Sequence, residues 1–458
     1  MVKHVVVLGA GISGLSAAWR LCDNGIRVDV LESSPSVGGL AGTFRKDNYC
    51  LDFGPHSFFS DDQQIVNTVL RLFENKLEPQ QREVKFYYRG KYLDYPLTAQ
   101  SILLQMGLWS GIQAALSFLK GVLFPSKRVA TEEEDETVED WAITSFGEYL
   151  YRSFFKVYTE QFWGIPCSEL SSRSIPTHTR MSFMNTLRLL LHRKASKAGD
   201  SLIEREMLPT YYPDTGFGEI AELTAKVIEE KQGHIHLGCR VEGVTELPDG
   251  KMRTFYQCNG QTKEMDSDYI ISTIPLPLLV KMLNPPPPPE VQAATDKLDY
   301  RSLVVLGMLT HKQNILNCGY IYLLNQPFNR ISEMNEFSSR TSPPGENILA
   351  VEITCMQDSP VWTATKEELF DMCIGNLAED GFLTPSDVKR LFLVKAPYAY
   401  PIYRKDYRVN LNRLTGYLKK YRSLATLGRC GEFIYMDVDK CMRRAFNFID
   451  KNIGDFKH

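Results

Sequence analysis

The start of the chain constrains its fold more than any other segment. An apolar, β-branched run over residues 4–8 leads into the glycine-rich turn G-A-G-I-S-G of residues 9–14, after which apolar residues recur at helical spacing. A second apolar run, residues 28–31, ends at Glu32. This order predicts a strand, a tight turn, a helix and a second strand that ends in a carboxylate, which is the arrangement of dinucleotide-binding folds.

Each residue of this turn has a separate physical role. Gly9 permits the tight turn, Gly11 lets a pyrophosphate approach the backbone because it has no Cβ, and Gly14 lets the helix pack closely on the strand. The N–H groups at the start of the helix, around Ser13, are expected to bind phosphate. Glu32 is placed to bind both ribose hydroxyls, and a carboxylate there disfavours a 2′-phosphate, so FAD or NAD is favoured over NADP.

A second glycine pair distinguishes these two cofactors. Gly38 and Gly39 follow Glu32 closely and allow a second approach of the backbone to the cofactor. FAD is longer than NAD and lies extended through its proteins, so the pair favours FAD; the alternative is a plain turn. Ser33, next to Glu32, and Leu40, next to the glycine pair, are therefore expected to join the cofactor contacts.

Length and charge limit the class of protein. The 458 residues are too many for one simple core and enough for two or three domains. With 52 basic and 55 acidic side chains the net charge is −3, which does not match the electrostatic pattern of a nucleic-acid-binding protein. We expect a small-molecule substrate, no nucleic-acid partner, and an oligomeric state that the sequence leaves open.

The ten cysteines show no C-x-x-C pair and no histidine at zinc-ligand spacing. They are expected to be reduced, mostly buried thiols of a cytoplasmic protein without a metal site. The apolar N-terminus is interpreted as the first strand rather than as a signal peptide. The apolar segment 101–125 carries Gln105, Gln113 and Lys120, so we expect buried or amphipathic helices there and no transmembrane segment; a helix on a membrane surface is the alternative.

Later segments return to the first domain. A strand pattern over residues 233–241, which ends at Val241, a buried strand over 268–275 and a strand over 424–429 all have the character of a dinucleotide-binding sheet. The expected fold class is α/β: a discontinuous Rossmann-type FAD-binding domain, a mixed-sheet substrate domain and a helical cap. The expected boundaries are 1–60, 201–290 and 396–458 for the FAD-binding parts, 61–200 for the helical cap, and 291–395 for the mixed sheet.

No serine, cysteine or metal-based catalytic pattern is evident, which suits a flavoenzyme, because the cofactor then supplies the difficult chemistry. The glycine pair followed by Y-x-x-D-x-G-x-H (residues 49–56) resembles the FAD-dependent amine oxidase and protoporphyrinogen oxidase-like superfamily. Four motifs together are most similar to UDP-galactopyranose mutase-like flavoproteins: G-P-H-S-F (54–58), Y-T-E-Q-F-W-G (158–164), F-N-R-I-S-E (328–333) and G-R-C-G-E-F-I-Y-M-D-V-D (428–439).

This resemblance implies roles for particular residues. His56 would lie beside the flavin, and Arg330 and Tyr435 would contact the substrate diphosphate. Further expected flavin contacts are Val241, Gly428, Arg429, Asp437 and Val438, and further expected substrate contacts are Tyr158, Trp163 and Tyr403. The simpler alternatives are a turn hydrogen bond for His56, core packing for the aromatic residues, including the stretch 398–403, and an ion pair of Arg330 with Glu333.

The implied activity is that of an FAD-dependent enzyme acting on a nucleotide-activated sugar through flavin N5. The chain departs from the mutase pattern at Phe59, where a second histidine is usual. A second diphosphate-binding arginine is not in register either, although Arg173, Arg180 and Arg188 lie nearby. The alternatives are an oxidase or desaturase that transfers hydride to flavin, and a flavin-bearing scaffold. For the mutase we expect Arg330 to face the substrate space near His56 and Tyr435, joined by a second arginine.

Overall fold

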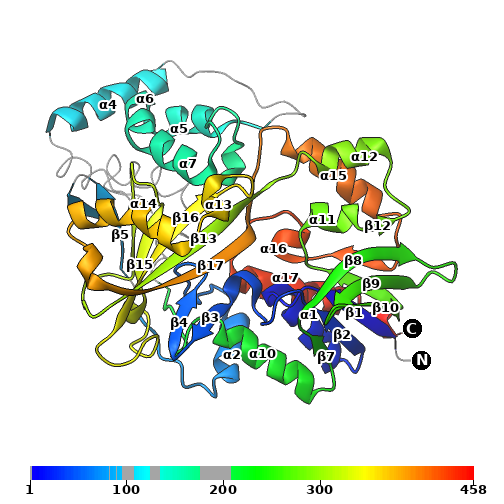
Figure 1. Cartoon of the computed structure of the whole chain (residues 1–458). Helices are drawn as coiled ribbons and strands as arrows, with labels where there is room; N and C mark the ends of the chain where they lie inside the picture. Colours follow the sequence, from blue (N-terminus) through cyan, green and yellow to red (C-terminus); the bar gives the residue numbers. More distant parts are fainter. Residues whose placement is uncertain are drawn as a thin grey trace.

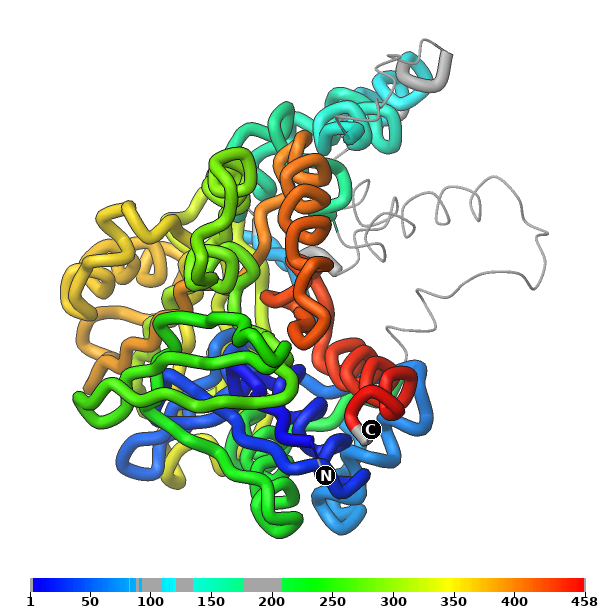
Figure 2. The backbone as a smooth tube through the Cα atoms, turned by 90° about the vertical axis from the view of Figure 1, so that its right-hand side faces the viewer, coloured from blue at the N-terminus to red at the C-terminus, as the bar shows by residue number. Residues whose placement is uncertain are grey.

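The computed structural model describes residues 3–81, 83–88, 90–94, 108–123, 135–175 and 208–457. Two sheet-bearing regions lie side by side, and a group of helices covers the upper end of one of them (Figure 1). The two ends of the chain lie close together at the outer edge of the first region (Figures 1 and 2). The expected α/β architecture, with its Rossmann-type and mixed sheets, is therefore present.

The first region is built on a five-stranded parallel sheet in the order β18-β11-β1-β2-β7. Its strands come from three distant parts of the chain: β1 His4–Leu8, β2 Arg27–Leu31, β7 His234–His236, β11 Tyr269–Ser272 and β18 Leu424–Thr426. On one face, alternate strand residues such as Val5 and Val28 pack on three helices, α1 Ile12–Asp23, α10 Glu219–Glu230 and α17 Val438–Lys451. The sequence therefore folds into a discontinuous Rossmann-type sheet.

A second set of strands and helices packs on the opposite face of this sheet. Val6 and Leu8 of β1 pack there against a small four-stranded sheet and three helices. The strands run in the order β10-β9-β8-β12 and span β8 Cys239–Glu246, β9 Met252–Cys258, β10 Gln261–Ser267 and β12 Leu283–Asn284. The helices are α11 Leu276–Lys281, α12 Pro289–Thr295 and α15 Tyr407–Leu418. The Rossmann-type sheet is thus the middle layer of three.

The second region is a seven-stranded mixed sheet in the order β17-β13-β16-β15-β14-β5-β6. The strands are β5 Val84–Tyr88, β6 Lys91–Asp94, β13 Tyr300–Thr310, β14 Tyr320–Leu323, β15 Arg330–Glu333, β16 Asn347–Cys355 and β17 Val388–Pro401. Only β14 and β5 pair in parallel among its neighbours. Every residue of β13 and β16 is buried, because α13 Pro360–Thr363 and α14 Lys366–Glu379 cover one face and the hairpin of β3 Thr43–Lys46 and β4 Tyr49–Asp52 covers the other.

A helical layer lies beside the mixed sheet at the top of Figure 1. It consists of α4 Leu108–Leu123, α5 Val138–Phe146, α6 Glu148–Leu150 and α7 Lys156–Trp163, with a π-helical turn at Tyr151–Phe155. Part of the segment 101–125, and both Arg180 and Arg188, lie outside the described residues. Within the described part of the chain, no helix is both long enough and apolar enough to cross a bilayer. The remaining α-helices of the described residues are α2 Gln63–Leu72, α16 Gly428–Gly431 and α18 Ile453–Lys457.

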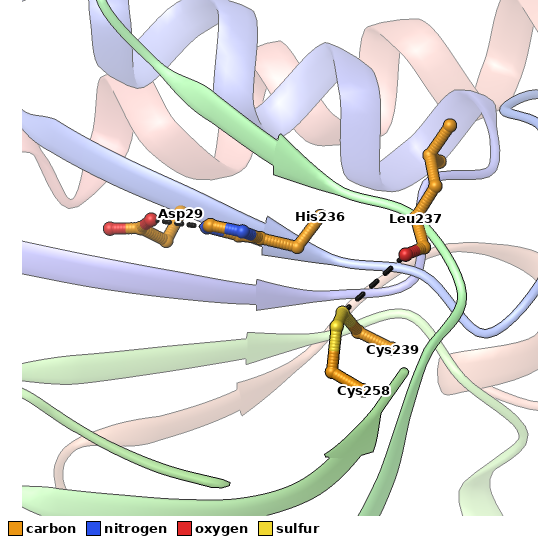
Figure 3. Close-up of a disulfide and its surroundings, with 5 residues drawn as sticks. All are labelled: Asp29, His236, Leu237, Cys239 and Cys258. Carbon is orange, nitrogen blue, oxygen red and sulfur yellow. Dashed lines mark hydrogen bonds and ion pairs between the residues drawn. A yellow bond between two sulfur atoms is a disulfide. The ribbon is translucent and has the colours of Figure 1, made fainter. Parts of the chain in front are cut away.

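A disulfide links two strands beside the Rossmann-type sheet. Cys239 of β8 and Cys258 of β9 are direct cross-strand partners, and their sulfur atoms are bonded (Figure 3). The prediction that all ten cysteines are thiols is therefore wrong for this pair. Sequence spacing missed it because the two residues are nineteen positions apart and meet only through strand register. Of the other eight cysteines seven are buried, as expected.

A buried carboxylate ties three strands of the parallel sheet together close to the disulfide. Asp29 of β2 is 3 % exposed and accepts a hydrogen bond from Nε2 of His4 at 2.7 Å. It accepts a second from Nε2 of His236 at 2.6 Å (Figure 3). Burial alone would raise the pKa of Asp29, but the two imidazole hydrogen bonds outweigh it and lower the pKa. The folded state therefore favours the ionised carboxylate.

The D29N variant should be less stable than the wild type by about 2 kcal/mol at pH 7, because both imidazoles lose a charged acceptor. A depressed carboxyl pKa stabilises the fold above the unfolded value near 3.9 and loses its effect as pH falls below it. The difference between the two proteins should therefore shrink below about pH 4. Denaturant-induced unfolding at pH 7, 5 and 3.5 measures this difference in stability. The control is D450N, which removes a charge from an exposed ion pair with Arg20. Equal stability at pH 7 would contradict the assignment.

Candidate active site

A large cavity of about 740 Å³ lies where the carboxyl ends of β1 and β2 face the mixed sheet. Its walls come from segments that are far apart in the sequence. Fourteen of the residues singled out from the sequence line it: Gly9, Gly11, Ser13, Glu32, Ser33, Gly38, Gly39, Leu40, His56, Arg330, Arg429, Tyr435, Asp437 and Val438. Binding of a ligand at the carboxyl edge of a parallel sheet is the general rule for such folds.

The two glycine segments lie against each other on the floor of the cavity. The Gly38 N–H donates to the Ala10 carbonyl at 2.8 Å, and Gly11 and Gly38 form a parallel bridge. Gly9 and Gly38 have φ values of +97° and +107°, which side chains rarely tolerate. A Cβ on Gly11 would meet nothing within the protein closer than the Gly38 carbonyl at 4.0 Å. A side chain there would thus fill space that the cavity leaves to a ligand.

Glu32 is held at the rim of this floor by backbone and hydroxyl donors. Its Oε2 accepts from the Ala10 N–H at 2.8 Å, and its Oε1 accepts from the N–H and the hydroxyl of Ser34 at 2.8 and 2.5 Å. A carboxylate has about four acceptor sites, so these bonds fill both sites of Oε1 and leave one on Oε2. The carboxylate can therefore accept directly from a ribose hydroxyl through Oε2.

Two helices begin at the cavity. The first turn of α1 follows Gly11, and that of α17 follows Asp437; neither helix has a side chain that caps its free N–H groups. Ile12 and Ser13 of α1 and Val438 and Asp439 of α17 line the cavity. Uncapped N–H groups and the positive end of a helix dipole attract anions. With the glycine floor and Glu32, they make a site that fits a dinucleotide with a diphosphate, as FAD has.

Arg429 enters the cavity from the short helix α16. Its guanidinium lies over the rings of Tyr400 at 4.9 Å and Tyr435 at 4.3 Å, and its Nε is buried without a hydrogen-bond partner among the described residues. The helix is anchored by Gly428, whose φ is +84° and where a Cβ would lie 2.2 Å from the Ser13 hydroxyl. A buried cation that contacts aromatic rings and has an unfilled donor favours an anionic ligand.

Arg330 approaches the same cavity from β15. Its Nη2 donates to Oε2 of Glu352 on β16 at 2.5 Å and lies 3.4 Å from the Tyr400 hydroxyl. The ion pair considered from the sequence therefore forms with Glu352 and not with Glu333, whose oxygens accept from the Leu316 N–H and from Nδ2 of Asn347. Proximity in the sequence pointed to Glu333, but Arg330 pairs with Glu352 because the two residues face each other across neighbouring strands.

Tyrosines form much of the wall opposite the glycine floor. Tyr320, Tyr322, Tyr400 and Tyr435 all line the cavity. The rings of Tyr400 and Tyr435 are nearly parallel, at 10° and 6.3 Å between centroids. Tyr435 is 37 % exposed, yet desolvation by the groups around its hydroxyl first, and Asp437 second, raise its pKa, so the hydroxyl stays protonated at neutral pH and can donate a hydrogen bond.

The loop that carries His56 is fixed by the hairpin before it. The His56 ring stacks on Phe217 with 5.1 Å between centroids. Two residues before Gly54, the buried Asp52 accepts from the hydroxyls of Thr43 at 2.5 Å and Tyr212 at 2.7 Å. Burial raises the pKa of Asp52 to about 6, against the opposing effect of these hydrogen bonds. Asp52 of the Y-x-x-D-x-G-x-H motif thus holds the loop, and His56 faces the cavity.

Six of the residues singled out from the sequence do not line this cavity. Gly14 packs against Gly9, where a Cβ would lie 2.0 Å from the carbonyl oxygen, and Gly428 packs against Ser13. Val241 and Trp163 are buried in two other cores. The remaining two support lining residues: the Tyr403 hydroxyl accepts from the Tyr435 N–H at 2.7 Å, and the Tyr158 ring meets Tyr322 edge-on at 5.5 Å. Roles of these residues in binding ligands stay predictions.

Arg429, predicted as a flavin contact, lines the same cavity as Arg330 from the other region of the molecule, and the second diphosphate-binding arginine stays a prediction. Arg173, one of the three arginines considered, lies 3.3 Å from Asp135 and away from the cavity lining. The sequence analysis missed Tyr320, Tyr322 and Glu352. The alternating Y-I-Y-L pattern of residues 320–323 predicts a strand with both tyrosines on one face. Nothing local in the sequence indicates that this face meets a cavity.

Comparison with known proteins gives the family. Residues 12–410 match the family described as flavin containing amine oxidoreductase. The curated relatives include the probable UDP-galactopyranose mutase of Klebsiella pneumoniae, 28 % identical over 171 residues that make up 37 % of this chain and 43 % of that protein. The dTDP-fucopyranose mutase of Escherichia coli is 25 % identical over 37 % of this chain and 44 % of its own length. The chain thus spans less than half the length of these curated relatives.

Solved structures extend the likeness of fold to the whole chain. A reduced UDP-galactopyranose mutase superposes with a TM-score of 0.77 at 21 % identity and covers 99 % of this chain and 96 % of its own. A putative protoporphyrinogen oxidase from Exiguobacterium sp. 255-15 superposes with a TM-score of 0.74 at 16 % identity, with 99 % of both chains covered. The chain belongs to the flavin containing amine oxidoreductase family, and it is an enzyme whose cofactor is FAD.

Proposed function

We propose that FAD lies along the glycine floor of the cavity. Its pyrophosphate would meet the N–H groups at the start of α1, near Gly11 and Ser13, and its ribose would meet Glu32. The start of α17, at Val438, offers a second set of uncapped N–H groups. Bound there, the flavin supplies the nucleophilic and redox chemistry of the enzyme.

The substrate we propose is a nucleotide-activated sugar, as in the mutases that the chain is similar to. The observation that carries this proposal is the convergence of two guanidinium groups on one cavity. Nε of Arg330 and Nε of Arg429 are both buried without a hydrogen-bond partner among the described residues. A diphosphate is costly to bury unless several cationic donors meet it, and arginine forks match its oxygens.

The residues around these arginines suit the departure of a nucleoside diphosphate. Charge develops on the diphosphate as it leaves the sugar, and preorganised donors stabilise that charge. Arg429 and Arg330 would bind the phosphate oxygens, and the protonated hydroxyl of Tyr435 would donate a further hydrogen bond. His56, on the loop that meets the Arg330–Glu352 pair at Gly54, would fix the position of the reacting part of the sugar.

One observation favours a second candidate, an oxidase that removes hydride from its substrate. The parallel rings of Tyr400 and Tyr435 form an apolar surface, and the charge of Arg330 is offset by Glu352. A substrate with a large apolar part, such as the ring system of a porphyrinogen, or an amine, would suit such a surface. The two candidates differ in what they need from Arg330 and Arg429, because the diphosphate brings several phosphate oxygens that require cationic donors together.

The glycine floor gives a test of FAD binding. The G11V variant should fold but lose FAD, because Gly11 has φ −71° and the new side chain would meet only cavity space. A G14A variant should lose both its fold and its FAD, since its Cβ would lie 2.0 Å from the Gly9 carbonyl oxygen. G375V, in open space on α14, is the control. Flavin absorbance per protein and circular dichroism measure the two effects; a G11V protein with full flavin would contradict the placement.

The nucleotide-sugar proposal predicts that the reduced enzyme binds UDP-galactose and that R429M weakens this binding by roughly 10- to 100-fold. That range corresponds to loss of one or two charge-assisted hydrogen bonds. Titration followed by the flavin spectrum measures it, with flavin content checked for each protein. R253M, which removes a charge from an exposed pair with Asp266, should bind as the wild type does. No binding of UDP-galactose, with oxygen-dependent turnover of an amine or a porphyrinogen, would favour the oxidase.

A further inference from the structure

The ion pair between β15 and β16 is more deeply buried than other arginine or lysine pairs on the described residues, such as that of Arg173 with Asp135. Arg330 and Glu352 face each other in strand register, and their atoms Nη2 and Oε2 are 2.5 Å apart. The Glu352 side chain is 1 % exposed and the Arg330 side chain 15 %. Such a pair is strongly perturbed by loss of either partner, because the remaining charge is left buried.

The pair also supports the loop that carries His56. Gly54 has φ +105°, and a Cβ at this position would lie 2.9 Å from Oε2 of Glu352 and 3.5 Å from Nη2 of Arg330. Glycine is therefore required there for two reasons, backbone conformation and the proximity of the carboxylate. The ion pair and the cavity loop are in direct contact at this point.

The electrostatic situation of Glu352 differs from that of Arg429. Oε1 of Glu352 is buried and has no hydrogen-bond partner among the described residues, so its interaction with the protein is concentrated on Arg330. Arg429 contacts tyrosine rings instead of a carboxylate. The two arginines therefore contribute unequally: Arg330 brings donors whose charge is cancelled, and Arg429 brings a full charge.

We propose that Glu352 is a positioning residue that holds Arg330 at the cavity wall and offsets its charge, so that of the two arginines that line the cavity only Arg429 meets a diphosphate with its full charge. This inference rests on the proposed nucleotide-sugar function. Its physical consequence concerns the return of the diphosphate to the sugar. The separated diphosphate carries more negative charge than the bound substrate, so two uncompensated guanidinium groups would stabilise the separated state most. Binding energy spent on that state does not accelerate the reaction.

The E352Q variant separates charge from shape, because glutamine has the same size and its carbonyl oxygen still accepts from Arg330. E352Q should bind UDP-galactose about tenfold more tightly, since one charge several ångströms away contributes on that order. It should also raise the reduction potential of the flavin, because a negative charge near the cofactor site is removed. The potential does not depend on the identity of the substrate.

The E352D variant keeps the charge and shortens the side chain. Its flavin potential should stay near that of the wild type, but its affinity for UDP-galactose should fall, because Arg330 is no longer held in place. The matched control is E333Q. Glu333 is a buried glutamate on the neighbouring strand whose oxygens are satisfied by the Leu316 N–H and by Asn347, and it does not line the cavity. E333Q can lower stability but should leave both readouts unchanged.

The experiment uses the purified, FAD-loaded protein and its variants, with spectroelectrochemical titration for the potential and UDP-galactose titration for the affinity. A raised potential and tighter binding in E352Q, with the opposite change of affinity in E352D, support the inference. Values for E352Q that equal those of E333Q overturn it while the nucleotide-sugar proposal stands. If the wild type binds no UDP-galactose, the proposed function fails. The flavin reduction potential of E352Q alone then decides whether Glu352 offsets the charge of Arg330.

Discussion

The close contact between two glycine segments is the constraint on which the structure of the site depends. Gly11 and Gly38 form a backbone bridge where neither could carry a side chain without loss of space or of conformation. This contact holds the end of β1 against the segment after β2 and leaves a floor of bare backbone. The start of α1, the carboxylate of Glu32 and the cavity above them all take their positions from it.

The wall of the cavity on the side of the mixed sheet depends on strand pairing and not on a glycine contact. Strand register brings Arg330 beside Glu352, and the turn at Gly54 meets the pair from the first region of the molecule. The mixed sheet is thus connected to the FAD-binding region through a charged contact and not through apolar packing alone. A side-chain change on either strand reaches the loop that carries His56.

Charge in the cavity is distributed unevenly, and this decides what the site can bind. The uncapped helix starts and Arg429 attract anions, while Glu352 removes the charge of Arg330 without removing its hydrogen-bond donors. The tyrosines contribute hydroxyl donors and apolar ring faces. The chain is similar to mutases and oxidases, and the combination of Arg429, the Arg330–Glu352 pair and an aromatic surface is where their requirements differ.

The Rossmann-type region could be predicted from the sequence because its motif is local. A strand, G-x-G-x-x-G, a helix and a terminal carboxylate lie within 32 consecutive residues, so their spacing already defines their geometry. The glycine pair and the Y-x-x-D-x-G-x-H motif likewise led to the correct family and cofactor.

The partners of buried charges were decided only by the tertiary structure. Glu352 for Arg330, the two histidines for Asp29 and Cys258 for Cys239 are all contacts across strands. The same holds for the tyrosine wall, because residues 320–323 show a strand pattern but not which face meets a cavity. The sequence by itself determined the strand, the glycine turn, the helix and the carboxylate at the start of the chain, since backbone conformation and spacing are local. Strand register and the meeting of distant segments depend on the packing of the whole chain, and these determined the charge of the site.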